Sequence, residues 1–188
     1  MNHSRGIEQI VRSAASRGLP AGQCGPRPLT GAVVYRSVGP QMAITPAPET
    51  AAEIAALFVP WVEQTYGAKL DYGVYSLKQV DGILDDLRKD QKFEDLQPLL
   101  FSMGCYVGEV LVRRAGGRWR SAEAVGMTAV ASSPIVVAMP DGRGCNPVGK
   151  VYKRFQNGPQ DSIAGFFQLM TVAPPPEKLA GGPRKETP

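Results

Sequence analysis

Residues 99–119, LLFSMGCYVGEVLVRRAGGRW, are the stretch around which we expect the rest of the chain to pack. Apolar residues recur in it at three- and four-residue spacing, which is typical of a helix with one broad apolar face. They are Leu99, Leu100, Met103, Tyr106, Val107, Val110 and Leu111. Gly104 and Gly108 lie four residues apart, so another element can approach the helix backbone there. Gly116 and Gly117, after two arginines, indicate its end. The stretch predicts a central core helix.

Length and composition predict one domain without a metal or disulfide scaffold. The chain has 188 residues, of which 43% are hydrophobic, and this is sufficient for a core. Its three cysteines, Cys24, Cys105 and Cys145, lie far apart and form no CxxC pair or Cys/His cluster. We therefore expect no metal, no cofactor and a reducing, cytoplasmic location. No apolar run reaches the length of about 18 residues that a membrane span requires.

The formal charge of +4 lies entirely in residues 1–41, which hold five arginines and one glutamate. Three interpretations of this leader stay open: a disordered segment outside the domain, translated upstream sequence before a true start at Met42, or a transit peptide. We expect one globular domain over residues 42–172. Residues 173–188 are rich in Pro, Gly and charged residues, which predicts a disordered tail.

Two helices are expected before the central one. Thr50 with Glu53, and Ser76 with Gln79, have the spacing of capping boxes and predict where these helices begin. Pro60 lies within the apolar pattern of the first helix and predicts a bend or a break there.

The second helix carries a group of charged residues beside its apolar positions. They are Asp81, Asp85, Asp86 and Arg88. Their spacing differs from that of a calcium loop, and charges on a helix usually form its solvated face, so we expect them to face water. A polar connection then leads to the central helix, with Pro98 in its first turn.

A small antiparallel meander is predicted after the central helix. Its strands are expected at residues 119–122, 134–139 and 143–146, with the β-branched run PIVVAM in the middle strand and a Pro-Asp-Gly turn after it.

Two further helices follow the meander. Asn146 and Pro147 are typical of an N-cap and a first helical position, and Gly158 of a C-terminal glycine. Either Asp161 or Ser162 is expected to cap the last helix. The fold class is therefore α+β: about five helices around a central glycine-containing helix, with the meander inserted before the last two.

The domain lacks residues that several kinds of catalytic site require. The only histidine is His3, in the leader, so a Ser-His-Asp or Cys-His apparatus has no base inside the domain. Residues 141–150, DGRGCNPVGK, contain glycines and a lysine but match no phosphate-binding loop, and we interpret them as a turn followed by a helix.

Glu109 is the residue of the domain with the clearest potential for chemistry. It lies within the central helix, where a buried carboxylate is destabilising unless paired, and Arg113 one turn later is its natural partner. One interpretation makes Glu109 a perturbed acid or base in a cleft with Tyr106, Trp119 and Lys150. The other makes Glu109 and Arg113 a structural pair that fixes how Trp119 and the meander dock on the helix. No residue is assigned as catalytic.

Basic residues are in excess over acidic ones in the second half of the domain. Between Glu109 and Arg154 the chain has eight basic and three acidic residues. If the basic residues share a face, the surface is dipolar and suits a protein partner. Nucleic-acid binding is not expected, because neither exposed strand aromatics nor a recognition helix with polar base-reading residues is evident.

Three stretches resemble a family of small uncharacterised bacterial proteins. They are LDYGVYSLKQVDGILDDLR, GCYVGEVLVRRAGGRW and NPVGKVYKRFQNGPQDS. The family pattern has an LDYS-like start of a helix, a GxYxGEV helix running to GxW, and an NPxxKV helix ending in NGxxDS. The matching residues are Asp71, Tyr72, Gly104, Tyr106, Gly108, Glu109, Trp119, Asn146, Pro147, Lys150, Asn157, Gly158, Asp161 and Ser162. Gly73 departs from it, at the serine. The resemblance implies a bacterial cytoplasmic domain and no particular activity.

The primary functional hypothesis is a non-enzymatic module that binds a protein, as the partner or neutralising subunit of another bacterial protein. The alternative is a small-ligand-binding domain or an enzyme with a carboxylate-based site around Glu109. A third hypothesis is a weak polyanion binder acting through the basic residues 113–154.

Overall fold

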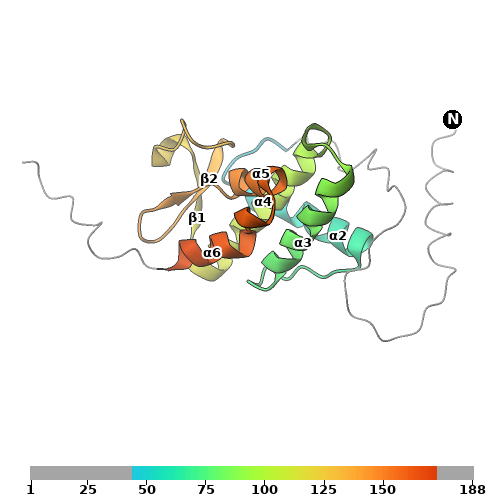
Figure 1. The fold of residues 1–188 in the computed structure, drawn as a ribbon. Helices are drawn as coiled ribbons and strands as arrows, with labels where there is room; N and C mark the ends of the chain where they lie inside the picture. Colours follow the sequence, from blue (N-terminus) through green and yellow to red (C-terminus); the bar gives the residue numbers. More distant parts are fainter. Residues whose placement is uncertain (1–43, 173–188) are drawn as a thin grey trace, which may run out of the picture.

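The computed structural model describes residues 44–172, and the predictions for the leader and for residues 173–188 lie outside this part. Within it the chain forms five helices and a three-stranded antiparallel sheet, so the predicted α+β class is confirmed. Figure 1 shows the sheet at one end of the described part, beside the last helix, with the first two helices at the other end. No helix of residues 44–172 has the length and apolar character needed to cross a membrane.

Helix α4 is the centre of the core, as the apolar pattern predicts. The first three helices are α2 (Ala51–Tyr66), α3 (Ser76–Asp90) and α4 (Phe93–Ala115). Every residue of α4 from 102 to 111 is buried, and α4 packs against both α2 and the later helix α5. It ends at Gly116, whose φ of 70° is left-handed, as predicted. Pro60 lies inside α2 without dividing it.

The start of α4 differs from the prediction. The helix begins at Phe93, so that Pro98 lies in its second turn rather than in its first. Phe93 packs edge-on against Tyr152, with 5.2 Å between ring centroids, and Leu96 is only 1% exposed. These tertiary contacts stabilise helical turns that the polar sequence by itself does not indicate.

Neither predicted capping box forms. The hydroxyl of Thr50 accepts a hydrogen bond from Ala47 N at 3.0 Å, and it makes no cap bond to α2. Ser76 is the first residue of α3 rather than its N-cap, and its hydroxyl donates to the carbonyl of Gly73 at 2.6 Å. Both hydroxyls bond to the preceding turn, which is the local alternative open to Ser and Thr at these positions.

The meander is confirmed: its first strand begins one residue earlier than predicted, and its second and third strands are shorter than predicted. It consists of β1 (Arg118–Ser121), β2 (Ile135–Ala138) and β3 (Gly144–Cys145), in that order across the sheet. A short 3-10 helix, η1 (Glu123–Val125), follows β1. In β1, Trp119 pairs with a residue of the buried central strand, so β2 connects Trp119 to the core.

The last two helices have the predicted caps. They are α5 (Pro147–Asn157) and α6 (Ile163–Thr171), joined by the 3-10 helix η2 (Pro159–Asp161). The side chain of Asn146 accepts a hydrogen bond from Gly149 N at 2.8 Å and caps α5. Ser162 caps α6 by accepting from Gly165 N at 3.2 Å.

Candidate functional site

Both carboxylate oxygens of Glu109 have partners. Glu109 is 4% exposed, its Oε1 accepts from Trp119 Nε1 at 2.9 Å, and its Oε2 accepts from Arg113 Nε at 3.0 Å. The side chain therefore connects α4 to β1, which is the arrangement that the structural interpretation of Glu109 requires. Both bonds compensate for the hydration that the carboxylate loses at this depth.

Gly108 allows the indole of Trp119 to reach Glu109. A Cβ atom at Gly108 would lie 2.2 Å from the Trp119 ring, and one at Gly104 would lie 2.6 Å from the backbone of Val148 in α5. Both positions therefore require glycine, and the predicted close approach of other elements to α4 is confirmed.

An aromatic chain extends from Arg113 into the core. The Arg113 guanidinium lies 3.6 Å from the centroid of the Tyr72 ring, which stacks on Tyr106 at 4.7 Å. The Tyr106 hydroxyl accepts from Tyr72 N at 2.9 Å and lies 2.7 Å from Ser76 Oγ. Because the Ser76 proton already bonds to Gly73, Tyr106 is the donor in that second contact. These contacts hold Tyr72 at φ 56°, a left-handed conformation that is uncommon for a bulky residue.

The phenols of Tyr72 and Tyr106 remain protonated at neutral pH. Burial raises the pKa of Tyr106, and the hydrogen bond that its oxygen accepts from Tyr72 N opposes that shift. Burial also raises the pKa of Tyr72, and the charge of Arg113 opposes that shift. Both phenols are therefore hydrogen-bonding and stacking groups, and neither is a base at neutral pH.

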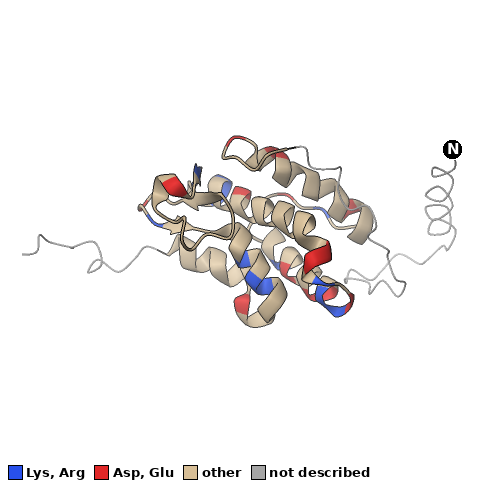
Figure 2. Ribbon diagram, turned by 90° about the horizontal axis from the view of Figure 1, so that it is seen from above, with Lys and Arg blue, Asp and Glu red and all other residues tan. Residues whose placement is uncertain are grey.

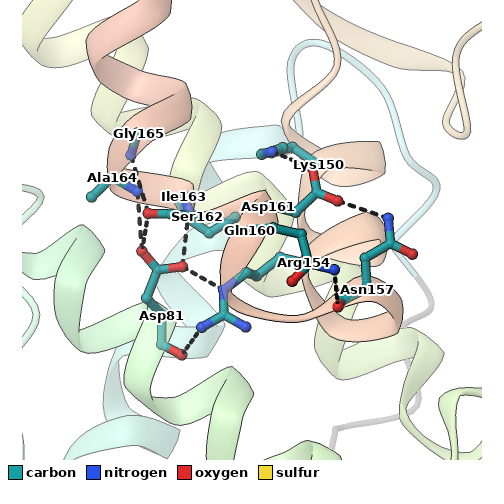
Figure 3. Close-up of polar contacts among 10 residues, drawn as sticks. All are labelled: Asp81, Lys150, Arg154, Asn157, Gln160, Asp161, Ser162, Ile163, Ala164 and Gly165. Atoms are coloured by element: carbon teal, nitrogen blue, oxygen red, sulfur yellow. Dashed lines mark hydrogen bonds and ion pairs between the residues drawn. The ribbon is translucent and has the colours of Figure 1, made fainter.

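Lys150 belongs to a different group from Glu109. Its Nζ lies 2.6 Å from Asp161 Oδ1, and Asp161 Oδ2 accepts from Asn157 Nδ2 at 2.7 Å (Figure 3). The hydrogen bond from Lys150 lowers the pKa of Asp161. Of the other residues predicted to line a cleft, Tyr106 is fully buried and Trp119 is half-buried against α4.

The prediction that the acidic residues of α3 face water is wrong for Asp81. Its side chain is 16% exposed, and its Oδ1 accepts from Arg154 Nε at 2.8 Å and from Ile163 N at 2.9 Å. Oδ2 accepts from Ser162 Oγ at 2.9 Å and from Ala164 N at 3.1 Å (Figure 3). A carboxylate of α3 thus caps the N-terminus of α6, where the helix dipole favours a negative charge.

Arg154 is the cation of this second group and is 2% exposed. It also forms an ion pair with Asp85 at 2.8 Å, and its Nη1 is buried without a partner among residues 44–172. Burial opposes the charged form, but the hydrogen bonds that Arg154 donates to Asp85 and Asp81 outweigh it and raise the pKa of Arg154. Sequence reasoning missed this group, although Asp81 lies one turn from the buried Leu77 and thus beside the apolar stripe.

Much of the basic charge between Arg113 and Arg154 is used within the fold. Arg143 pairs with Asp141 at 2.6 Å and donates to the last carbonyls of α6, including that of Met170 at 2.9 Å. Figure 2 shows acidic and basic segments next to one another on the described part. Because Arg143, Lys150 and Arg154 each form an ion pair with an aspartate, the basic residues of this range do not form one uninterrupted positive face.

No group of three or more His, Cys, Asp or Glu residues suited to a metal ion occurs among residues 44–172. Cys105 and Cys145 are buried free thiols, and burial raises the pKa of each to about 12. Both are protonated at neutral pH, a state in which a thiol is a poor nucleophile and a poor metal ligand.

Comparison of the chain with protein-family models, with curated proteins and with solved structures finds no match in any of the three. The resemblance to a bacterial family therefore stays a prediction.

Proposed function

We propose that this domain acts by binding another protein, and that Glu109 stabilises the fold rather than catalysing a reaction. The observation that carries the proposal is the state of the Glu109 carboxylate, which is 4% exposed and bonded at both oxygens to side chains of its own chain. A general base needs to lie within hydrogen-bond reach of a substrate proton. Glu109 is buried at 4% exposure, so a substrate could not reach its carboxylate without displacing the side chains packed around it.

Exposed residues of the kind that dominate protein interfaces gather beside this group. Tyr75 is 75% exposed and Val74 is 43% exposed, and both lie two to three residues after Tyr72 in the loop before α3. Arg113 and Arg114 are exposed and contact Tyr72 through its ring and its carbonyl. We call these five residues the Tyr75 surface. Tyrosine and arginine are enriched among the residues that contribute most to binding at protein interfaces.

The proposed setting is a reducing bacterial cytoplasm. It is supported by the two buried cysteines of the described part, which are both free thiols. Proteins of oxidising compartments more often use such residues in disulfides.

The test is affinity capture of the tagged full-length chain from its own host after mild cross-linking, with mass spectrometry of proteins and of small molecules. A protein partner in near-stoichiometric amount is expected. Glu109→Gln should lower the free energy of unfolding by about 1–3 kcal/mol, since it breaks a charge-assisted hydrogen bond in a buried site. Below its melting temperature it should capture the same partner. A co-purifying small molecule that Glu109→Gln abolishes at unchanged stability would contradict the proposal.

A further inference from the structure

We infer that the Tyr75 surface recognises an acidic segment of the partner protein, with carboxylates on Arg113 and Arg114 and an apolar or aromatic side chain against Tyr75. This inference rests on the proposed function and names the chemistry of the partner.

Both guanidinium groups are held in place by the fold and keep their terminal nitrogens available. Arg113 donates its Nε to Glu109 and its guanidinium lies over the Tyr72 ring, while its side chain remains 46% exposed. Arg114 donates its Nε to the carbonyl of Tyr72 at 3.0 Å. No Nη atom of either arginine has a hydrogen bond within residues 44–172. Two terminal nitrogens of an oriented guanidinium match the two oxygens of a carboxylate.

The loop that carries the exposed apolar residues is also fixed. Tyr72 is held in its left-handed conformation by Tyr106, and Asp71 Oδ1 accepts from Gly73 N at 2.8 Å immediately after it. Tyr75, two residues further on, is largely exposed. A bulky residue in this conformation is a feature that points to function when its surroundings enforce it. Since the loop and the arginines are ordered before binding, less conformational entropy is lost on association.

Charge favours an acidic occupant over a neutral or basic one. Lys78 adds a third cation, its Nζ lying 5.6 Å from the Tyr75 ring centroid. Asp71 adds one negative charge to the loop, and the buried Glu109 neutralises the charge of Arg113. The remaining charge is positive and lies around an exposed aromatic ring, which suits a short acidic peptide with one bulky residue. A long nucleic-acid backbone would need a longer basic track than these three cations supply.

The test uses a displayed library of random twelve-residue peptides, selected against the full-length protein at physiological salt. The selected peptides are expected to contain two or more Asp or Glu residues beside an aromatic or aliphatic one. Arg114→Gln and Tyr75→Ser should each weaken their binding by about tenfold or more, because truncation of a dominant interface residue has at least that effect. Both side chains are exposed, so the fold should tolerate these variants, which circular dichroism and thermal melting will verify.

The matched control is Arg120→Gln with Lys153→Gln, which removes two exposed cations outside the Tyr75 surface. This double variant should bind the selected peptides within about twofold of the wild type. Selection of peptides without acids, or equal weakening in the control, would overturn the inference. Binding of heparin or of a DNA duplex that depends on Arg114, with no acidic peptide selected, would also overturn it and assign the surface to polyanions.

Capture from the host and peptide selection together show whether the Tyr75 surface or the proposed function fails. If the wild type and the double variant Arg114→Gln/Tyr75→Ser capture the same host protein equally well, the proposed function stands and the role of the Tyr75 surface is refuted. Acidic peptides that bind in the expected way, without any protein captured from the host, would support the surface and contradict the proposed function.

Discussion

Replacing Asp81 by alanine should destabilise the domain far more than the same change at Asp85, one turn later on α3. Asp81 caps α6 through two backbone amides and pairs with the buried Arg154. Asp85 is 43% exposed and contributes only an ion pair to the same arginine. The two substitutions are thus matched in residue type and helix, and they differ in burial and in capping.

The magnitude follows from the contacts that each variant loses. Loss of an N-cap lowers stability by about 1 kcal/mol. Loss of a charge-assisted hydrogen bond to a buried guanidinium adds about 2 kcal/mol. We therefore expect about 3 kcal/mol for Asp81→Ala, or a melting temperature lower by about 10 °C. For Asp85→Ala we expect about 1 kcal/mol or less, because a half-exposed ion pair contributes little.

The assay is urea unfolding of the full-length chain, followed by tryptophan fluorescence and circular dichroism, with hydrogen exchange as a local readout. Asp81→Ala should lower the midpoint without changing the slope, and should reduce the protection of the Ile163 and Ala164 amides that it caps. In the Asp81→Ala background, Arg154→Met should restore part of the loss, because it removes an insufficiently paired buried charge. Equal midpoints for Asp81→Ala and Asp85→Ala would refute the reasoning.

Three other predictions come from separate parts of the domain. Gly108→Ala should lower the free energy of unfolding by about 2 kcal/mol or more, because the added methyl group clashes with the indole ring of Trp119. Gly82→Ala has open space around it and should raise the free energy of unfolding by about 0.5–1 kcal/mol. The urea midpoints of the two variants check both values. Cys105 and Cys145, each with a pKa of about 12, should accept iodoacetamide only after denaturation, and peptide mapping that finds either residue alkylated in the folded chain would contradict their burial. The pKa of Asp161 in the folded chain lies below its ordinary 3.8, so near that pH the unfolded state binds more protons than the folded state. The stability that Asp161 adds is therefore present above about pH 3.8 and is lost as the pH falls through the lowered pKa. Asp161→Asn should therefore reduce the difference between urea midpoints measured at about pH 6 and about pH 3, and an undiminished difference would exclude this contribution.

Local signals in the sequence were sufficient for much of the fold. The end of α4 at Gly116 and the N-cap at Asn146 depend on residues within one turn of the feature that they define, and local signals limited the cap of α6 to Asp161 or Ser162. Gly104 and Gly108 predicted close approach to α4, since only glycine leaves that space. The partnership of Glu109 with Arg113 was also readable, because residues four apart on a helix are neighbours.

Tertiary structure alone decided the role of Asp81 and the conformation of Tyr72. Asp81 meets Arg154 and the start of α6 across sequence separations of 73 residues and more, and no local periodicity encodes such contacts. Tyr72 is held left-handed by Tyr106, 34 residues away, against its own backbone preference. The sequence by itself determined the number and order of the helices and the meander, but not the first turns of α4. Which charged side chains are buried, and which loop presents exposed aromatic and basic groups, depended on how the helices pack, because burial is a property of neighbours distant in the chain.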